Sequence, residues 1–233
     1  LENAILYRND ERISFHAEAA YVVEHLLWDL NRRALEVHDD LLLLHAGAVV
    51  HDGVGLLLPA EPGAGKSTLT AGLVRDGAGY LSEEIAVVDS TRPVLRSHQS
   101  PLVIKGESRD LLADLRPSEV ATLAPHYIPD RWHVAGSAIR RGALARQARP
   151  RLIITPNYVI DGRTELTPVS RATMVGILAS QTLRPRDRHG RTLERLRDLA
   201  AATSCYRLTY GDLEDACRIV AHVAAAVGRE QRP

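Results

Sequence analysis

The sequence has few of the features that mark metal-binding, secreted or membrane-spanning proteins. It contains only two cysteines, Cys205 and Cys217, and their spacing does not form a metal-binding pattern. No secretory signal is visible, so we expect two reduced thiols in a cytoplasmic protein. No uninterrupted apolar run approaches the roughly 20 residues that a membrane-spanning helix needs. We therefore expect no membrane partner.

The chain also lacks an excess of charge of either sign. Lys and Arg together number 29, and Asp and Glu together also number 29. This balance argues against a general affinity for nucleic acid or for anionic membranes. Hydrophobic residues make up 45% of the chain, so it can bury a sizeable core. The chain has two lysines, Lys66 and Lys105, and Lys66 lies in a glycine-rich motif at residues 60–67.

The most informative stretch is residues 60–67, which read Ala-Glu-Pro-Gly-Ala-Gly-Lys-Ser. It lies between an apolar run at 54–58 and a helix-like stretch at 68–74. This order of strand, glycine-rich loop and helix is typical of the P-loop (Walker A) motif, whose backbone amides hold phosphates at a helix N-terminus. Gly63 and Gly65 permit a close approach of the backbone to a phosphate. A glycine-rich turn without a ligand is the alternative, but the flanking elements favour phosphate binding.

Several residues of this motif have expected roles. Lys66 is expected to reach the β- and γ-phosphates, and the Ser67 hydroxyl is expected to hold Mg²⁺. Ala60 stands where the usual motif has its first glycine, which alanine can replace if its φ is negative. The residues predicted to bind the nucleotide are Glu61, Pro62, Gly63, Ala64, Gly65, Lys66, Ser67 and Thr68.

Hydrophobic periodicity predicts strands and helices along most of the chain. His51-Asp52-Gly53 is a hairpin signal, and Asp212 is a good N-cap for the last helix. Residues 116–150 give no clear pattern. We expect residues 1–40 to pack on a core formed by residues 41–233. The expected strands are 4–7, 12–15, 41–50, 54–58, 80–89, 94–96, 102–105, 151–156 and 205–210, and the expected helices are 18–37, 68–74, 109–115, 170–180, 192–203 and 213–227.

Two acidic residues, Glu83 and Glu84, follow Lys66 by 17 and 18 residues. In P-loop proteins an acid on a neighbouring strand completes the Mg²⁺ site. Adjacent strand residues point to opposite faces, but irregular backbone at a strand end can bring both carboxylates near the phosphates. We expect one of them to help bind Mg²⁺ and the other to accept a proton from a substrate hydroxyl. An exposed acidic turn is the alternative.

Other candidates flank this region. His45 interrupts the apolar run at 41–50, where a polar side chain needs a partner. Pairing of this run with the strand before the P-loop would place His45 beside the nucleotide site, with a purely structural histidine as the alternative. Arg188, His189 and Arg191 belong to a basic loop that could contact phosphate or substrate, or could be a solvated surface loop. The basic run at 140–151 favours a surface or partner site over a catalytic one.

Taken in order, these motifs resemble the C-terminal domain of the HPr kinase/phosphorylase family, most strongly within residues 41–90. The pattern at 205–213 is also similar to the end of these proteins. The nearest resemblance is to smaller, stand-alone HPr-kinase-like proteins, some of which phosphorylate lasso-peptide precursors. The resemblance implies an α/β fold of the HPr kinase/PEP carboxykinase-like type, with a central mixed sheet flanked by helices. The residues that carry it are Leu44-His45-Ala46-Gly47-Ala48-Val49, Leu57-Leu58-Pro59, Gly63-Ala64-Gly65-Lys66-Ser67-Thr68-Leu69 and Gly79-Tyr80-Leu81-Ser82-Glu83-Glu84.

The resemblance also implies a function. It predicts an ATP-dependent, Mg²⁺-requiring kinase that transfers the γ-phosphoryl group to a hydroxyl, foremost a Ser or Thr of a peptide or protein. Glu83 would be the base, with His45 and Lys66 as further catalytic residues and Ser67 and Glu84 as metal ligands. HPr kinases assemble as hexamers, so a homo-oligomer is among the expectations.

The sequence departs from the family pattern at two places in this region. The base of HPr kinases is an aspartate, one methylene shorter than Glu83, and the arginine that commonly follows the acid pair is Ile85 here. A nucleotide-dependent switch or ATPase without phosphotransfer, and a small-molecule kinase, therefore stay open as alternatives. No phosphorylase signature is evident, so reverse phosphorolysis is not carried over. The sequence identifies neither the acceptor nor the preference for ATP over GTP.

Overall fold

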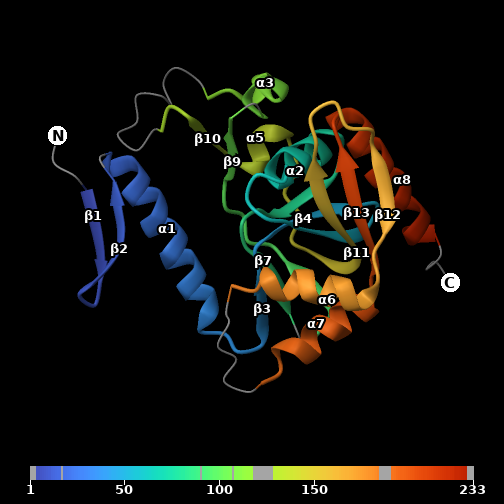
Figure 1. Cartoon of the computed structure of the whole chain (residues 1–233), viewed down its shortest axis with the longest axis horizontal. Coiled ribbons are helices and arrows are strands. Elements are labelled where there is room, and N and C mark those ends of the chain that lie inside the picture. The colour runs from blue at the N-terminus through green and yellow to red at the C-terminus, as the bar shows by residue number, and fades with distance from the viewer. Residues whose placement is uncertain are drawn as a thin grey trace.

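A mixed, nine-stranded β-sheet flanked by helices forms the centre of the molecule (Figure 1). The computed structural model describes residues 4–16, 18–89, 91–106, 108–117, 128–183 and 190–229. This architecture is the predicted α/β fold. The main path of the sheet is β3 (Leu41–Leu44), β7 (Ala86–Asp89), β8 (Val94–Arg96), β11 (Gln147–Tyr158), β5 (Val54–Pro59), β4 (Ala46–His51) and β6 (Gly79–Ser82), and β13 (Ser204–Tyr210) lies between β11 and β12 (Glu165–Pro168).

The parallel strands β5, β11 and β13 are neighbours, whereas the other strand pairs are antiparallel. All six residues of β5 are buried, as expected of a parallel strand that is covered on both faces. The glycine-rich loop follows β5 directly. It therefore lies at the carboxyl edge of the parallel strands, where open α/β sheets bind their ligands.

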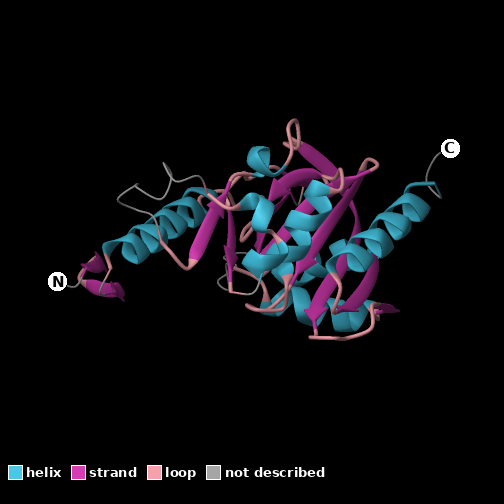
Figure 2. Cartoon of the chain, turned by 90° about the horizontal axis from the view of Figure 1, so that it is seen from above, coloured by secondary structure: helices cyan, strands magenta, loops and turns pink. Residues whose placement is uncertain are grey.

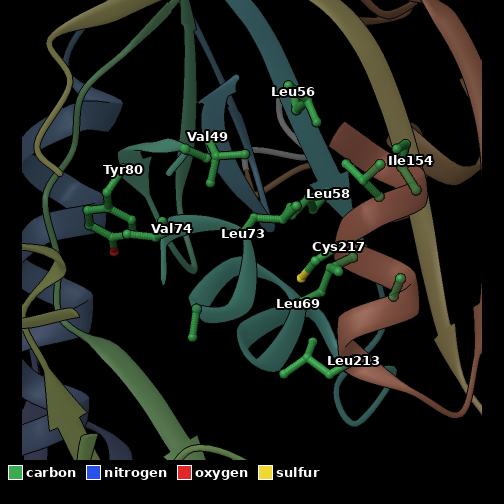
Figure 3. Close-up of a cluster of buried hydrophobic side chains, with 14 of the residues drawn as sticks. Val49, Leu56, Leu58, Leu69, Leu73, Val74, Tyr80, Ile154, Leu213 and Cys217 are labelled. Atoms are coloured by element: carbon green, nitrogen blue, oxygen red, sulfur yellow. The ribbon is translucent and has the colours of Figure 1, made fainter. Parts of the chain in front are cut away.

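Two helical layers cover the faces of the sheet, and alternate residues of β5 contact different layers. Leu56 and Leu58 belong to a core cluster with α2 (Lys66–Arg75) and α8 (Leu213–Arg229). Leu57 belongs to a second cluster with α6 (Arg171–Ser180) and α7 (Thr192–Ala201). Figure 3 shows the first cluster, in which Leu69 and Leu73 of α2 lie near Leu213 and Cys217 of α8. This packing holds the P-loop helix firmly against the sheet.

Local signals in the sequence explain several element boundaries. Asp52 and Gly53 have φ angles of +50° and +80°, as a tight hairpin between β4 and β5 requires. The side chain of Asp212 accepts a hydrogen bond from the Asp215 N–H at 2.8 Å, which confirms the predicted cap of α8.

The N-terminal hairpin and helix lie to one side of the sheet (Figures 1 and 2). Strands β1 (Ala4–Arg8) and β2 (Glu11–His16) pair with each other and contact α1 (Ala19–Glu36). The C-terminal end of α1 meets the core where Leu35 packs near Leu41 and Leu43 of β3. No helix in the described ranges is long and apolar enough to cross a membrane.

A second small sheet lies between α1 and the central sheet. It consists of β9 (Leu102–Lys105) and β10 (Arg131–Val134), which pair in antiparallel register. The nearby short elements are α3 (Ser108–Leu111), the 3₁₀ helix η1 (Ala113–Leu115) and α5 (Gly136–Ile139). Strand β10 and helix α5 fall within residues 116–150, where no pattern predicted them.

Two strands predicted to be continuous are interrupted in the structure. The run at 41–50 divides into β3 and β4 at His45, and the run at 80–89 divides into β6 and β7 at Glu83, Glu84 and Ile85. The reason is that β3 pairs with β7, while β4 pairs with β5 and β6. Both segments therefore change their pairing partners at the same level of the sheet. Hydrophobic periodicity does not reveal such a change. It also missed β12 and the first four residues of β11, which lie in the basic run.

The close approach of β5 to β11 is testable. Gly55→Ala should lower the free energy of unfolding by about 1–3 kcal/mol, because the new Cβ would lie 2.6 Å from the Arg149 carbonyl oxygen. Gly176→Ala in α6 is the matched control. It should leave stability unchanged or raise it by up to about 1 kcal/mol, because nothing lies within 4 Å of its new Cβ. Urea denaturation followed by circular dichroism compares the two, and equal stabilities would contradict the close approach.

Candidate functional site

The glycine-rich loop contains two glycines with positive φ angles. Gly63 and Gly65 have φ angles of +87° and +88°, in the left-handed region that glycine adopts most readily. A Cβ added to Gly65 would clash with the Tyr210 hydroxyl, whereas a Cβ on Gly63 would meet nothing within 4 Å. Gly65 thus faces the protein and Gly63 faces open space. The loop can therefore present its backbone amides to a ligand.

Two tyrosines at the ends of neighbouring strands hold this loop in place. The Tyr210 hydroxyl donates to the Gly65 carbonyl oxygen at 2.9 Å, and the Tyr158 backbone N–H donates to the Ala64 carbonyl oxygen at 3.1 Å. Burial raises the pKa of Tyr210, so its hydroxyl stays protonated at neutral pH and can donate. The sequence did not indicate this role, because an aromatic residue at a strand end more often signals packing.

A buried ion pair lies directly under the loop. Lys66 is 5% exposed and Glu83 is fully buried, and the Lys66 ammonium contacts Oε1 of Glu83. The same oxygen accepts a hydrogen bond from the Ser67 hydroxyl at 2.7 Å. Burial lowers the pKa of Lys66, but the charges of Glu83 and Glu84 outweigh it, and the pKa is raised overall. Lys66 is therefore a fixed positive charge at the start of α2, beside the glycine-rich loop.

Glu84 lies beside this pair, and its side chain is partly exposed. Its Oε2 is 3.2 Å from Nδ1 of His45, and its Oε1 is 3.5 Å from Nζ of Lys66. Burial by itself raises the pKa of Glu84. The hydrogen bond from His45 and the charge of Lys66 together have the larger effect, and they lower this pKa to about 2. The carboxylate is thus ionised throughout the physiological range. The structure brings together all five residues predicted to be catalytic or metal-binding: His45, Lys66, Ser67, Glu83 and Glu84.

The backbone between β6 and β7 explains how adjacent acids reach one site. Glu84 has a φ of +65°, and the Ile85 N–H bonds to the Glu83 carbonyl oxygen at 2.8 Å, which makes a tight turn. The Ser100 hydroxyl donates to the same carbonyl oxygen at 2.8 Å. In a regular strand the two side chains would point to opposite faces. A non-glycine residue at positive φ is uncommon, and such strain often marks functional sites.

One buried atom of the site lacks a partner. Oε2 of Glu83 has no hydrogen-bond donor within the described ranges. A buried carboxylate oxygen without a donor is costly, so this atom fits a donor supplied from outside, such as a hydroxyl or a metal-bound water. No group of three His, Cys, Asp or Glu residues in the described chain could hold a metal alone. Ser67 and Glu84 nevertheless suit Mg²⁺, which in nucleotide sites binds few protein ligands together with phosphate oxygens.

Gln181, at the end of α6, connects two parts of the site and was not anticipated. Its side-chain amide donates to Oε1 of Glu61 at 2.5 Å, and its backbone carbonyl accepts from the His45 N–H at 2.7 Å. Gln181 is 5% exposed. Because it lies 120 residues from Glu61, no local pattern in the sequence could have identified this contact.

A cleft of about 980 Å³ opens over the loop and extends to α1, β2, β9 and β10. Its volume lies at the upper end of the range for small-molecule sites, about 300–1,000 Å³. At the phosphate end it is lined by His45, Lys66, Ser67 and Glu84. Glu83 lies beneath this lining, behind Lys66. Any contact between Glu83 and a substrate therefore requires Lys66 and Ser67 to release its carboxylate.

The basic loop predicted to contact phosphate is not brought to the site by any described residue. Arg188 and His189 lie outside the described ranges. Arg191 is exposed at the start of α7 and is not part of the cleft lining.

The buried pair predicts a non-additive effect on stability. Lys66→Met should lower the free energy of unfolding by about 3–5 kcal/mol, because it leaves the Glu83 carboxylate buried without its cation. Adding Glu83→Gln to this variant should recover most of the loss, because neither buried charge remains. Urea denaturation at pH 7 without nucleotide measures the cycle. Additive losses in the double variant would show that the two groups are not coupled.

The chain has no match among protein-family models and none among curated proteins. Among solved structures, it is similar to the Hpr(Ser) kinase/phosphatase from Coxiella burnetii, with a TM-score of 0.39 and 10% sequence identity. The superposition covers 81% of this chain and 97% of that one. The likeness is a distant one.

Proposed function

We propose that the protein is an ATP-dependent, Mg²⁺-requiring kinase that transfers the γ-phosphoryl group to a Ser or Thr hydroxyl of a peptide or protein. The observation that carries this proposal is the convergence of Lys66, Ser67, Glu83 and Glu84 at a glycine-rich loop beside an open cleft. Phosphoryl transfer depends mostly on positioning and charge neutralisation, and this group of residues supplies both.

The loop and Lys66 bind the phosphates in this proposal. Backbone amides of the loop and the start of α2 donate to phosphate oxygens, and the Lys66 ammonium neutralises the β- and γ-phosphates. When bound with the nucleotide, Mg²⁺ would neutralise charge on the transferred group, and Ser67 and Glu84 would hold it. His45 keeps Glu84 oriented toward the phosphates through the 3.2 Å contact with its carboxylate.

Glu83 is the better candidate for the general base. Glu84 already bonds to His45 and Lys66, and its pKa of about 2 makes it a weak proton acceptor. Glu83 has the unpartnered Oε2 and can accept the proton of the incoming hydroxyl. A glutamate extends one methylene beyond the aspartate expected from the family resemblance. The longer side chain suits the buried position of Glu83 behind Lys66, because the carboxylate must reach a substrate hydroxyl in the cleft from beneath.

The contacts of Glu83 also imply an order of binding. Without nucleotide, its Oε1 holds both Lys66 and Ser67, the two side chains that the phosphates and Mg²⁺ require. Nucleotide binding would draw these two groups away and free the carboxylate. The acceptor hydroxyl would then meet a competent base only after the nucleotide has bound.

The proposal predicts different consequences for the two acids. Glu83→Gln should reduce phosphoryl transfer by about 10²–10⁴-fold without weakening nucleotide binding, because it removes the base and a competing partner of Lys66 and Ser67 rather than a phosphate contact. Glu84→Gln should weaken the Mg²⁺ dependence of nucleotide binding as well as transfer. Glu165→Gln, an exposed residue of β12, is the matched control. Transfer from γ-labelled ATP to pooled Ser- and Thr-containing peptides, together with fluorescent nucleotide titration, measures both quantities.

Three outcomes would contradict the assignment. Full transfer activity in Glu83→Gln would remove the proposed base. Release of phosphate to water alone, with no labelled peptide or metabolite, would favour an ATPase or switch. Transfer to small hydroxylated metabolites but not to peptides would favour a small-molecule kinase.

A further inference from the structure

One face of α1 forms the wall of the cleft opposite the phosphate end. Six of its cleft-lining residues recur at the spacing of one helical face, and Tyr21 and His25 line the cleft beside them. The six run from Ala20 to Asn31, and the 11 steps between these two residues correspond to about 17 Å at 1.5 Å per residue. The main residues of this face are Ala20, Val23, Glu24, Leu27, Trp28 and Asn31.

Several apolar side chains of this wall are not covered by the chain's own core. Leu27 is 56% exposed and Val23 is 39% exposed, although both line the cleft. Phe15 of β2 and Leu111 of α3 add further exposed apolar surface, at 51% and 48%. Exposed apolar side chains that gather in a cleft, rather than singly over the surface, indicate a binding surface.

Polar contacts connect α1 to β10. Arg131 Nη1 lies 2.6 Å from Oε2 of Glu24, and His133 Nε2 lies 3.0 Å from its Oε1. The Tyr21 hydroxyl donates to Asp130 at 2.5 Å. These bonds fix the N-terminal half of α1 while its apolar side chains stay available. These contacts therefore fix the wall of the cleft relative to β10.

The charge of this part of the cleft limits what it can bind. Burial raises the pKa of Glu24, but the bonds from His133 and Arg131 lower it overall, so Glu24 is ionised and already paired. Lys105, at the end of β9, adds a positive charge to the lining. Among the cleft-lining residues of α1, the acidic one is Glu24, and both of its carboxylate oxygens have basic partners. The surface thus suits an apolar or weakly acidic ligand and disfavours a basic one.

The apolar wall and the phosphate end belong to one continuous cleft. Between the two ends, the lining residues Ser108 and Thr68 bond to each other through their hydroxyls at 2.6 Å, which fixes the start of α3 to the start of α2. The wall along α1 is as long as about five residues of extended peptide, at 3.3 Å each. A nucleotide base alone would not cover it.

We infer that the α1 wall binds the acceptor, and that this acceptor is a peptide segment with apolar side chains close to the hydroxyl that is phosphorylated. This inference rests on the proposed function and specifies its substrate. The apolar side chains would pack against Leu27, Val23 and Phe15, and the hydroxyl would reach toward Glu83 at the phosphate end.

The experiment measures peptide binding separately from phosphoryl transfer. Fluorescein-labelled ten-residue peptides carry a central Ser flanked by Leu and Phe, by Asp and Glu, or by Lys and Arg. Their affinities are measured by fluorescence anisotropy with the whole chain, Mg²⁺ and a non-hydrolysable ATP analogue. The apolar peptide should bind tightest. Leu27→Gln should weaken its binding by about tenfold, which is the loss expected when one leucine no longer buries its side chain.

Leu30→Gln provides the matched control. Leu30 lies on the same helix and is 53% exposed, close to the 56% of Leu27, but it does not line the cleft. Leucine and glutamine have similar helix propensities, so both variants should keep the fold, which circular dichroism checks. Leu30→Gln should bind the apolar peptide as the wild type does.

Each other result has a defined meaning. Equal weakening by both variants, tightest binding of the basic peptide, or no peptide binding would overturn the inference. Weaker nucleotide binding in Leu27→Gln would also overturn it, because the wall would then bind the nucleotide's base. A change of mass in sedimentation would overturn it too, because the wall would then bind a second copy of the chain. Peptide binding that depends on Leu27 but leads to no labelled product would retain the peptide site and reject the kinase.

Discussion

The buried contact between Lys66 and Glu83 is the interaction on which the rest of the site depends. Two opposite charges with almost no solvent access are tolerated only if they lie together, since either one alone would carry a large desolvation cost. Lys66 comes from the first turn of α2 and Glu83 from the end of β6, so the pair fixes the P-loop helix relative to the sheet. Ser67, Glu84 and His45 then occupy positions defined by that pair.

The sheet is built so that this pair can form. Two segments of the sheet are interrupted at the same level. One interruption lies between β3 and β4 at His45, and the other lies between β6 and β7 at Glu83 and Glu84. Strand pairing differs on the two sides of this level, so the backbone there is free of a regular ladder. That freedom lets adjacent acids point toward one site and lets His45 reach Glu84. The polar groups therefore lie at a discontinuity of the sheet rather than within an unbroken strand, where they would have no partners.

Local patterns in the sequence predicted most of the elements and grouped the central residues correctly. The glycine-rich motif, the apolar strand before it and the acid pair are all short-range signals, and the family resemblance that they carry implied the α/β architecture. The interruptions at His45 and Glu84 were not predicted, because they arise from pairing between distant strands. The contacts of Gln181 with Glu61 and of Tyr210 with Gly65 were missed for the same reason, since each joins segments more than 100 residues apart. The predicted phosphate contact at Arg191 relied on charge alone, which says nothing about where a loop lies.

The scarcity of lysine has a chemical consequence at the cleft. The chain carries 29 Lys and Arg residues, but only Lys66 and Lys105 are lysines, and both line the same cleft. Side-chain amines are thus absent from the rest of the surface. Acylation, reductive methylation or a pyridoxal-type aldehyde would modify side chains at this one place, with the exposed Lys105 reacting before the ion-paired Lys66. Amine chemistry therefore provides a selective probe of whether the cleft is occupied.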